Sequence, residues 1–317
     1  MSYSSETKKE LSQIPTSSKI EALLELSAMA RMNASLVLNH EGVQLRLFSE
    51  NREVILRVAS LAHFLYGVKL TVYTQQNEQL QKTPIFFVLF AESEVNQLLV
   101  QSGMDLMGNV TEAEDRILGR LSTERNAKAY LRGAFLASGS VVDPEKSYHL
   151  EILAGNDLDC NLLKHVFQEL QLPIKCMRRR DATVFYLKDS ETISDFLISI
   201  GATGAMLKLE NVKAKKELRN DINRAANAET ANLDKQYAAS VRQLEAIHKI
   251  DKQIGLNHIA ETLRSVAEAR LAHPSMNLRE LGESMDPPVG KSGVNHRMQR
   301  IINMAEDLED SNEKQFR

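Results

Sequence analysis

Apolar and polar residues alternate along the N-terminal third of the chain in a way that predicts a definite order of elements. Apolar residues at helical spacing indicate amphipathic helices, period-two runs indicate half-buried strands, and polar segments between them indicate turns. The predicted elements are a helix over 19–33, strands over 35–38 and 43–48 joined by the turn 39–42, a helix with its apolar face between Val54 and Leu65, strands over 70–74 and 84–90, and a closing helix over 93–101.

The same order of elements recurs downstream, so the chain is predicted to contain two structural repeats. We place the repeats at 19–102 and 125–210, and residues 103–126 connect them, with helical periodicity in their later part. The second repeat is predicted to have a helix over 127–137, a strand over 148–153 after the turn at Asp143, a helix over 158–170, strands over 174–177 and 183–187, and a helix over 190–200 that Gly201 terminates.

Past residue 210 no strand-like pattern is left. The predicted segments outside the repeats are an N-terminal helical segment over 1–18, one or two long polar linker helices over 211–254, a compact helical domain over 255–310 and an acidic tail over 311–317. We expect the chain to fray from Glu306 onward. The predicted fold class is therefore α+β, with a two-repeat domain over 19–210 followed by an all-α domain.

Composition limits the classes of protein that fit this pattern. With 317 residues and a net charge of −3, the chain is long enough for two domains, and any contact with nucleic acid must come from local basic patches. Cys160 and Cys176 lack zinc-ligand spacing, and we expect buried, reduced thiols in a cytoplasmic protein. The polar N-terminus and the short apolar runs lead us to expect neither a signal peptide nor a membrane span.

Two segments look like copies of one short motif. They are Leu26–Ser35 and Leu131–Ser140, offset by 105 residues. Both resemble the helix-end signature of the LAGLIDADG homing endonucleases, in which the eighth position is an acid that holds a divalent metal. The resemblance implies a pseudo-symmetric domain in which both helix ends meet at the bottom of a saddle, flanked by two four-stranded sheets that lie in the DNA major groove.

Small residues in the second copy of the motif indicate close helix packing. Gly133 and Ala137 are four residues apart on one helix face, so they allow a second helix to approach backbone to backbone. Ala28 and Met32 hold the matching places in the first copy, and the larger Met32 predicts a looser or offset contact. The alternative is that both segments are ordinary core helices with small residues.

The eighth positions of the two copies, Asn33 and Ser138, are both neutral. Magnesium prefers anionic oxygen ligands, and an amide or a hydroxyl is weaker, so we expect no bound metal, no cofactor and no nuclease activity. Asp143 lies too far along the chain to replace a helix-end ligand. A residual nuclease with a rearranged metal site is the rival hypothesis from the enzyme class.

The C-terminal region has a pattern typical of a helix-turn-helix. Asn277 and Glu280 form a capping-box-like helix start, Pro287 and Pro288 end that helix, and Ser292 is a suitable N-cap for a longer one. A solvated helix with unrelated charges is the alternative. The longer helix is predicted to bury Val294, Met298, Ile301, Ile302 and Ala305 and to contact DNA through Lys291, Ser292, Asn295, His296, Arg297, Gln299 and Arg300.

Two further basic clusters are candidate phosphate contacts. One sits on or beside a hairpin of the second repeat, where a solvated hairpin tip is the alternative. The other follows the linker helix, where Glu217 and Asp221 interrupt it and indicate some ordinary surface pairing. The members are Lys175, Arg178, Arg179 and Arg180 in the hairpin cluster, and Lys213, Lys215, Lys216, Arg219 and Arg224 in the linker cluster.

The motif pair and several further segments together resemble the bacterial WhiA family, and the resemblance covers nearly the whole chain. Ala34 departs from the family, which usually has glycine there. The resemblance implies a DNA-binding regulator tied to cell division and chromosome segregation, or to sporulation in spore-forming relatives. The segments that carry it are 5–11, 130–137, 147–151, 223–224, 229–232 and 291–297.

Our leading hypothesis is a non-enzymatic regulator that binds double-stranded DNA and lies in the cytoplasm, associated with the nucleoid. In this hypothesis Asn295, His296 and Gln299 read bases. Arg297, Arg300 and the cluster Arg178–Arg180 grip the backbone. A third possibility is a scaffold whose saddle binds a protein partner instead of DNA.

Overall fold

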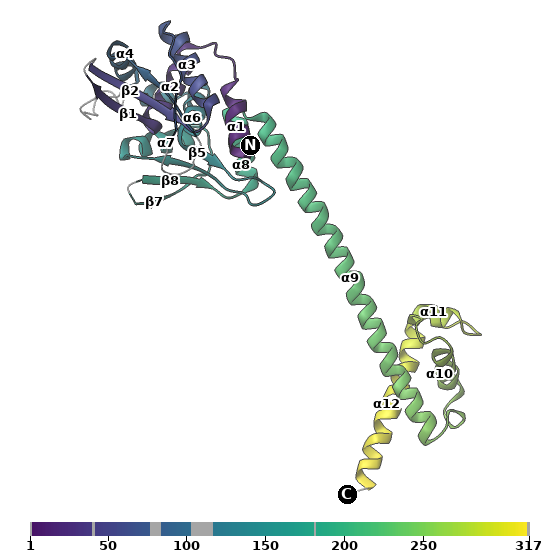
Figure 1. The fold of residues 1–317 in the computed structure, drawn as a ribbon. Helices are drawn as coiled ribbons and strands as arrows, with labels where there is room; N and C mark the ends of the chain where they lie inside the picture. Colours follow the sequence, from purple (N-terminus) through teal and green to yellow (C-terminus); the bar gives the residue numbers. More distant parts are fainter. Residues whose placement is uncertain (1, 40–41, 77–83, 103–116, 181, 316–317) are drawn as a thin grey trace. The chain divides into compact units, whose positions relative to one another are not determined.

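The computed structural model describes residues 2–39, 42–76, 84–102, 117–180 and 182–315. The chain divides into two compact units, Met1–Lys216 and Glu217–Arg317 (Figure 1). Each unit has its own hydrophobic core. The centre of the predicted turn 39–42 and most of the predicted connector 103–126 lie outside the described residues. Within the described ranges, no helix combines the length and the apolar character that crossing a membrane requires.

The first repeat has the predicted order of elements and forms a four-stranded antiparallel sheet with the strand order β1-β2-β4-β3. Buried residues alternate along β2 and β4, so one face of the sheet packs on the helices. The elements are α2 (Lys19–Asn33), β1 (Ala34–Asn39), β2 (Gly42–Ser49), α3 (Arg52–Tyr66), β3 (Tyr73–Gln75), β4 (Ile85–Phe90) and α4 (Glu92–Ser102).

The second repeat forms an equivalent antiparallel sheet with the strand order β5-β6-β8-β7. Its last helix ends at Gly201, which adopts the left-handed conformation (φ 91°), as the sequence predicts. The elements are α6 (Glu124–Ser138), β5 (Gly139–Val141), β6 (Leu150–Ala154), α7 (Asp157–Glu169), β7 (Lys175–Arg179), β8 (Ala182–Leu187) and α8 (Ser190–Ile200).

The repeats correspond residue by residue from the motif helix through the first hairpin. Ala34 lies opposite Leu47 across β1 and β2, and Gly139 lies opposite Ile152 across β5 and β6. Both pairs keep the offset of 105 residues that separates Asn33 from Ser138. The predicted α+β fold with two pseudo-symmetric repeats is therefore confirmed.

An N-terminal helix, α1 (Tyr3–Ser12), connects the repeats to the helix that follows them. Its inner face is buried, and it packs on α3, α6 and β5. The Glu10 carboxylate accepts the backbone N–H groups of Gly204 (2.6 Å) and Ala205 (3.0 Å), so it caps α9 (Thr203–Gln253). The capped helix α9 begins inside the range predicted for the second repeat.

The described part of the C-terminal unit contains helices and no strand. The capping box of Asn277 and Glu280 is confirmed. Two details of the prediction are wrong: α11 ends before the prolines, and α12 already includes Ser292. Besides the end of α9, the unit has a short turn of 3-10 helix at Leu256–His258, α10 (Glu261–Ala272), α11 (Leu278–Glu283) and α12 (Lys291–Gln315).

Two strand predictions shift and one strand is new. The strand predicted over 70–74 starts only at Tyr73, because Leu70 and Val72 pack on the core outside the β-ladder. The strand predicted over 148–153 is β6, displaced by one to two residues. The sequence pattern does not predict β5, because three residues directly after a helix are too few to show an alternation.

The two cysteines are both free but differ in exposure. Cys160 is buried on α7, whereas Cys176 is exposed on β7, the edge strand of its sheet, where all five residues are exposed. The prediction of two buried thiols is therefore wrong for Cys176.

Candidate nucleic-acid interface

Gly133 permits the close approach of the two motif helices, α2 and α6. A Cβ atom at Gly133 would lie 2.2 Å from the carbonyl oxygen of Glu25 and 3.0 Å from the Cβ atom of Ala28. Ala28 is fully buried, and Met32 and Ala137 are half-buried against the same core. The backbone of α2 therefore lies directly against Gly133, where any larger side chain would collide with a peptide group.

The eighth motif positions make equivalent hydrogen bonds in the two repeats. The side-chain amide of Asn33 donates to the carbonyl oxygen of Phe48 on β2 (2.7 Å), and the hydroxyl of Ser138 donates to that of Leu153 on β6 (2.8 Å). Phe48 and Leu153 keep the same offset of 105 residues. Each side chain therefore bonds the end of its helix to the sheet of its own repeat, at equivalent positions of the two sheets.

The residues around these positions offer few ligands for a divalent cation. Among the described residues, no three His, Cys, Asp or Glu side chains come together as a metal-binding group. Asp143, the first acid after the second motif, accepts the backbone N–H of Glu145 (3.0 Å) and shapes a turn. Asn33 and Ser138 supply only neutral oxygen atoms, a donor set that is weak for magnesium.

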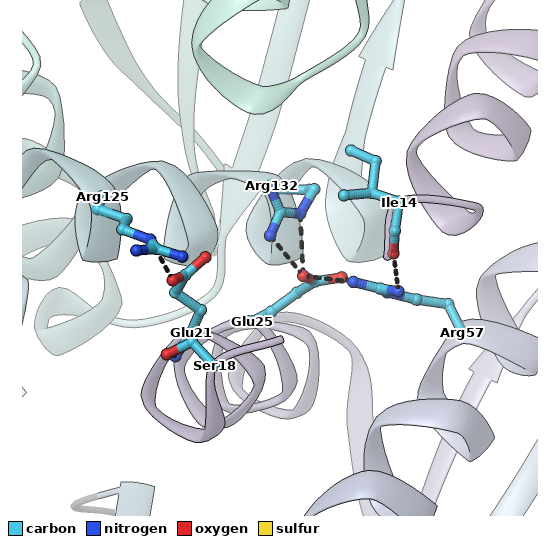
Figure 2. Close-up of polar contacts among 7 residues, drawn as sticks. All are labelled: Ile14, Ser18, Glu21, Glu25, Arg57, Arg125 and Arg132. Atoms are coloured by element: carbon cyan, nitrogen blue, oxygen red, sulfur yellow. Dashed lines mark hydrogen bonds and ion pairs between the residues drawn. The ribbon is translucent and has the colours of Figure 1, made fainter. Parts of the chain in front are cut away.

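A buried carboxylate links the two repeats (Figure 2). Glu25 of α2 is 1% exposed and accepts from Arg57 Nε (2.7 Å) and Nη2 (3.0 Å) within its own repeat. It also accepts from Arg132 Nε (2.9 Å) on α6 of the other repeat. Arg57 donates through Nη1 to the carbonyl oxygen of Ile14 (2.6 Å), so the network extends into the segment after α1.

A second buried ion pair crosses between the repeats. Arg31 of α2 lies 3.2 Å from Asp159 of α7, and the two side chains are 4% and 1% exposed. Burial raises the pKa of Asp159, while the charge of Arg31 and hydrogen bonds from Arg31 and Asn156 act in the opposite direction. Because both charges are inside the domain, the pair holds the repeats together rather than facing a substrate.

The predicted DNA-contacting residues of the C-terminal unit lie on the first turns of α12. The predicted buried stripe from Val294 to Ala305 is confirmed, so the opposite face of the helix points away from the core. Arg297 is half-buried at the edge of that face. The exposed residues among the candidates are Lys291, Ser292, Asn295, His296, Gln299 and Arg300.

The turn between α11 and α12 folds back tightly onto α11. The backbone N–H of Val289 donates to the carbonyl oxygen of Gly282 (2.9 Å). A Cβ atom at Gly282 would lie only 1.9 Å from the carbonyl oxygen of Val289. This contact sets how α11 and α12 pack, and so it fixes the geometry of the helix-turn-helix.

Two basic residues near Lys291 are not predicted from the sequence as candidates for DNA binding. Lys235 of α9 and Arg279 of α11 line, together with Lys291, one hollow of about 390 Å³ in the C-terminal unit. Arg279 also pairs with Glu283 (2.9 Å). Lys235 is far from the other two residues in the sequence, and no spacing pattern relates it to them. Only the packing of α9 against the later helices brings the three residues together.

The predicted hairpin cluster in the second repeat is divided between two faces. Lys175 and Arg179 share one face of β7 and Arg178 lies on the other, because side chains alternate along a strand. Arg178 lies 3.9 Å from Asp157 of α7. Arg180 stands after the strand with a positive φ of 55°. The three arginines are all exposed, but they do not form a single patch.

The cations at the start of α9 are partly engaged in surface pairing. Lys213 lies 3.2 Å from Glu191, and Arg224 pairs with Asp221 one helical turn earlier. Of the two acids that interrupt this cluster in the sequence, Asp221 therefore takes up part of its charge.

The fold and the two motif helices define a LAGLIDADG-like protein with an added helix-turn-helix domain. Family models for the WhiA N-terminal LAGLIDADG-like domain, the WhiA LAGLIDADG-like domain and the WhiA C-terminal HTH domain match residues 19–105, 127–219 and 222–305. A probable cell division protein WhiA from Clostridium botulinum is 38% identical over 97% of this chain and 99% of the relative. The chain belongs to the WhiA family.

Other relatives agree with this assignment. The probable cell division protein WhiA of Desulfitobacterium hafniense is 38% identical over 99% of this chain and 98% of its own length. The crystal structure of full-length WhiA from Thermatoga maritima matches with a TM-score of 0.60 at 23% identity, covering 97% of this chain and 99% of that one. At this level of identity the structural match shows a shared fold.

Proposed function

We propose that the chain is a sequence-selective DNA-binding regulator of cell division that does not cut DNA. The observation that carries the proposal is the exposed polar and basic face of α12 within a domain that matches the WhiA helix-turn-helix. Asparagine and glutamine can bond adenine edges, and arginine can bond guanine or phosphate. In this proposal Asn295, His296 and Gln299 contact the DNA bases. The protein lies in the cytoplasm, associated with the nucleoid.

In this proposal Arg297 and Arg300 bind the phosphate backbone. The variants Arg297→Ala and Arg300→Ala are each expected to weaken binding to a DNA duplex at all sequences, because each removes one phosphate contact. Each should also reduce the slope of log affinity against log salt by about one. Fluorescence anisotropy across a salt series measures both quantities.

The matched control is Arg264→Ala. Arg264 lies on α10 of the same unit and contacts Glu261 and Glu268, so its loss changes the net charge equally without touching the proposed interface. Unchanged affinity of the Arg297 and Arg300 variants at low salt would remove these residues from the interface. If the Arg264 variant lost as much DNA affinity, net charge alone would explain the effect of the Arg297 and Arg300 variants.

The proposal includes the absence of nuclease activity. It is supported by the side chains of Asn33 and Ser138, which are neutral and bond to carbonyl oxygens of the sheets. Supercoiled plasmid incubated with magnesium or manganese is therefore expected to stay intact. Metal-dependent nicking that Ser138→Ala abolishes would overturn the proposal in favour of a rearranged metal site.

A protein partner for the LAGLIDADG-like domain is the second candidate, and one observation favours it. The face of the first sheet that does not pack on helices carries aromatic residues: Tyr73 and Phe87 are stacked, and Arg46 lies over the Phe87 ring at 4.1 Å. Such a surface offers apolar area more than positive charge. If this domain binds protein instead of DNA, the half with residues 1–216 should not bind DNA when it is tested apart from residues 217–317.

A further inference from the structure

A cavity of about 620 Å³ lies beside the two eighth motif positions. Asn33 contributes to its wall from the end of α2, and the residues on either side of Ser138 contribute from the end of α6. The N-terminal part of α1 lines the same cavity with hydroxyl groups and with Lys8. The cavity is therefore built from both repeats and α1, and it lies entirely within the N-terminal unit.

Lys8 brings a positive charge to this cavity. Among the described residues Lys8 forms no ion pair, and its ammonium group lies 5.9 Å from the centre of the Phe135 ring. Burial lowers the pKa of Lys8 to about 8, and the exposed carboxylate of Glu50 at the cavity edge partly opposes this shift. A half-buried cation without a counter-ion costs free energy, which an anion in the cavity would recover.

Two serines that line the cavity with Lys8 have hydroxyl groups that can donate to a ligand. The Ser4 hydroxyl oxygen accepts the backbone N–H of Val141 (3.3 Å), and the Ser5 hydroxyl oxygen accepts the side-chain amide of Asn51 (3.3 Å). A hydroxyl that already accepts keeps its own proton for a further acceptor. Both side chains line the cavity, so their protons are available to a ligand there.

We propose that this cavity binds a small molecule through an oxyanion group, a phosphate or a carboxylate, with Lys8 as its counter-ion and Ser4 and Ser5 as hydrogen-bond donors. The volume is in the range typical of small-ligand sites. The two motif positions that frame the cavity are neutral, so no fixed carboxylate of the motifs repels an anion. The site is separate from the proposed DNA-reading face on α12.

The test is thermal unfolding of the full-length chain with inorganic phosphate or acetate, against potassium chloride at equal ionic strength. Either anion is expected to raise the unfolding midpoint of the wild type beyond the chloride control. The variant Lys8→Met should lose this gain. Without added anion, Lys8→Met should unfold at the same temperature as the wild type or higher, because the uncompensated charge is gone. A lysine with a purely structural role would give a lower midpoint.

Two further variants complete the experiment. Lys9→Met removes an exposed lysine from the same helix and should keep the full response. Glu50→Gln removes the exposed carboxylate near Lys8 and should tighten anion binding about two- to fivefold, the scale of one exposed charge interaction. A response to phosphate alone assigns a phosphoryl ligand, a response to acetate alone assigns a carboxylate, and a response to both supports a general oxyanion site. No gain over chloride in the wild type and Glu50→Gln, or an undiminished gain in Lys8→Met, overturns the proposal.

Discussion

Replacing Glu25 with glutamine is expected to destabilise the N-terminal unit by about 3–5 kcal/mol, the usual cost of removing one partner from a buried ion pair. Glutamine preserves the size of the side chain but leaves Arg57 (4% exposed) and Arg132 (11% exposed) without their counter-ion. Because Arg132 belongs to the other repeat, the change also weakens the contact between α2 and α6. Equilibrium unfolding by urea, followed by circular dichroism, measures the loss.

Glu21→Gln on the same helix is the control. Glu21 pairs with Arg125 of α6, but Arg125 is 71% exposed, so solvent screens this pair and its loss should cost about 1 kcal/mol or less. Figure 2 shows both pairs between the same two helices. If the two variants lost equal stability, burial of the Glu25 network would not be the source of its effect.

The role of Glu25 could not be predicted from the sequence. The apolar positions predict that α2 buries one stripe, and a charged residue between Leu24 and Leu26 would then face solvent. In the structure α2 packs on α3, α4 and α6, so Glu25 is buried, while Ile20 at the start of the apolar pattern is 53% exposed. Periodicity describes one helix, whereas burial on all sides depends on its neighbours.

The repeat itself could be predicted because its signals are local. The motif spacing gave the offset of 105 residues, and the same offset relates the N-cap residues of α3 and α7, Asn51 and Asn156. A side-chain cap acts within one turn of helix, so it can be recognised in the sequence. By contrast, Glu10 caps α9 from a helix that is far away in the chain. The sequence near Thr203 therefore contains no signal from which this cap could be predicted.

The candidate sites likewise combine features that are local in the sequence with contacts that only the folded chain creates. Asn33 and Ser138 are conspicuous in the sequence because they occupy motif positions, but their bonds to matching carbonyl oxygens appear only once the sheets are in place. Lys8 stands in a polar segment that looks solvated, and only the packing of α1 on both repeats places it beside a cavity. Contacts between segments distant in the chain therefore supply most of what the sequence lacks.

Gly282→Ala is expected to disrupt the C-terminal unit and to reduce DNA affinity at least about tenfold, equivalent to about 1.4 kcal/mol. Alanine in a helix gains about 1 kcal/mol in intrinsic propensity over glycine. Here the new methyl group would lie 1.9 Å from the carbonyl oxygen of Val289, a main-chain atom that no rotamer change can move. Overpacking costs about 1–3 kcal/mol even where side chains can adjust, so the collision outweighs the gain.

Gly290→Ala tests whether this effect comes from the close contact or from any change in the turn. An added Cβ atom at Gly290 meets no atom within 4 Å, so this variant should retain DNA affinity. Hydrogen exchange of α11 and α12 should rise in the Gly282 variant and stay low in the Gly290 variant, since the first forces the two helices apart. Wild-type protection and affinity in Gly282→Ala would show that the turn can shift without harm to the DNA-reading face.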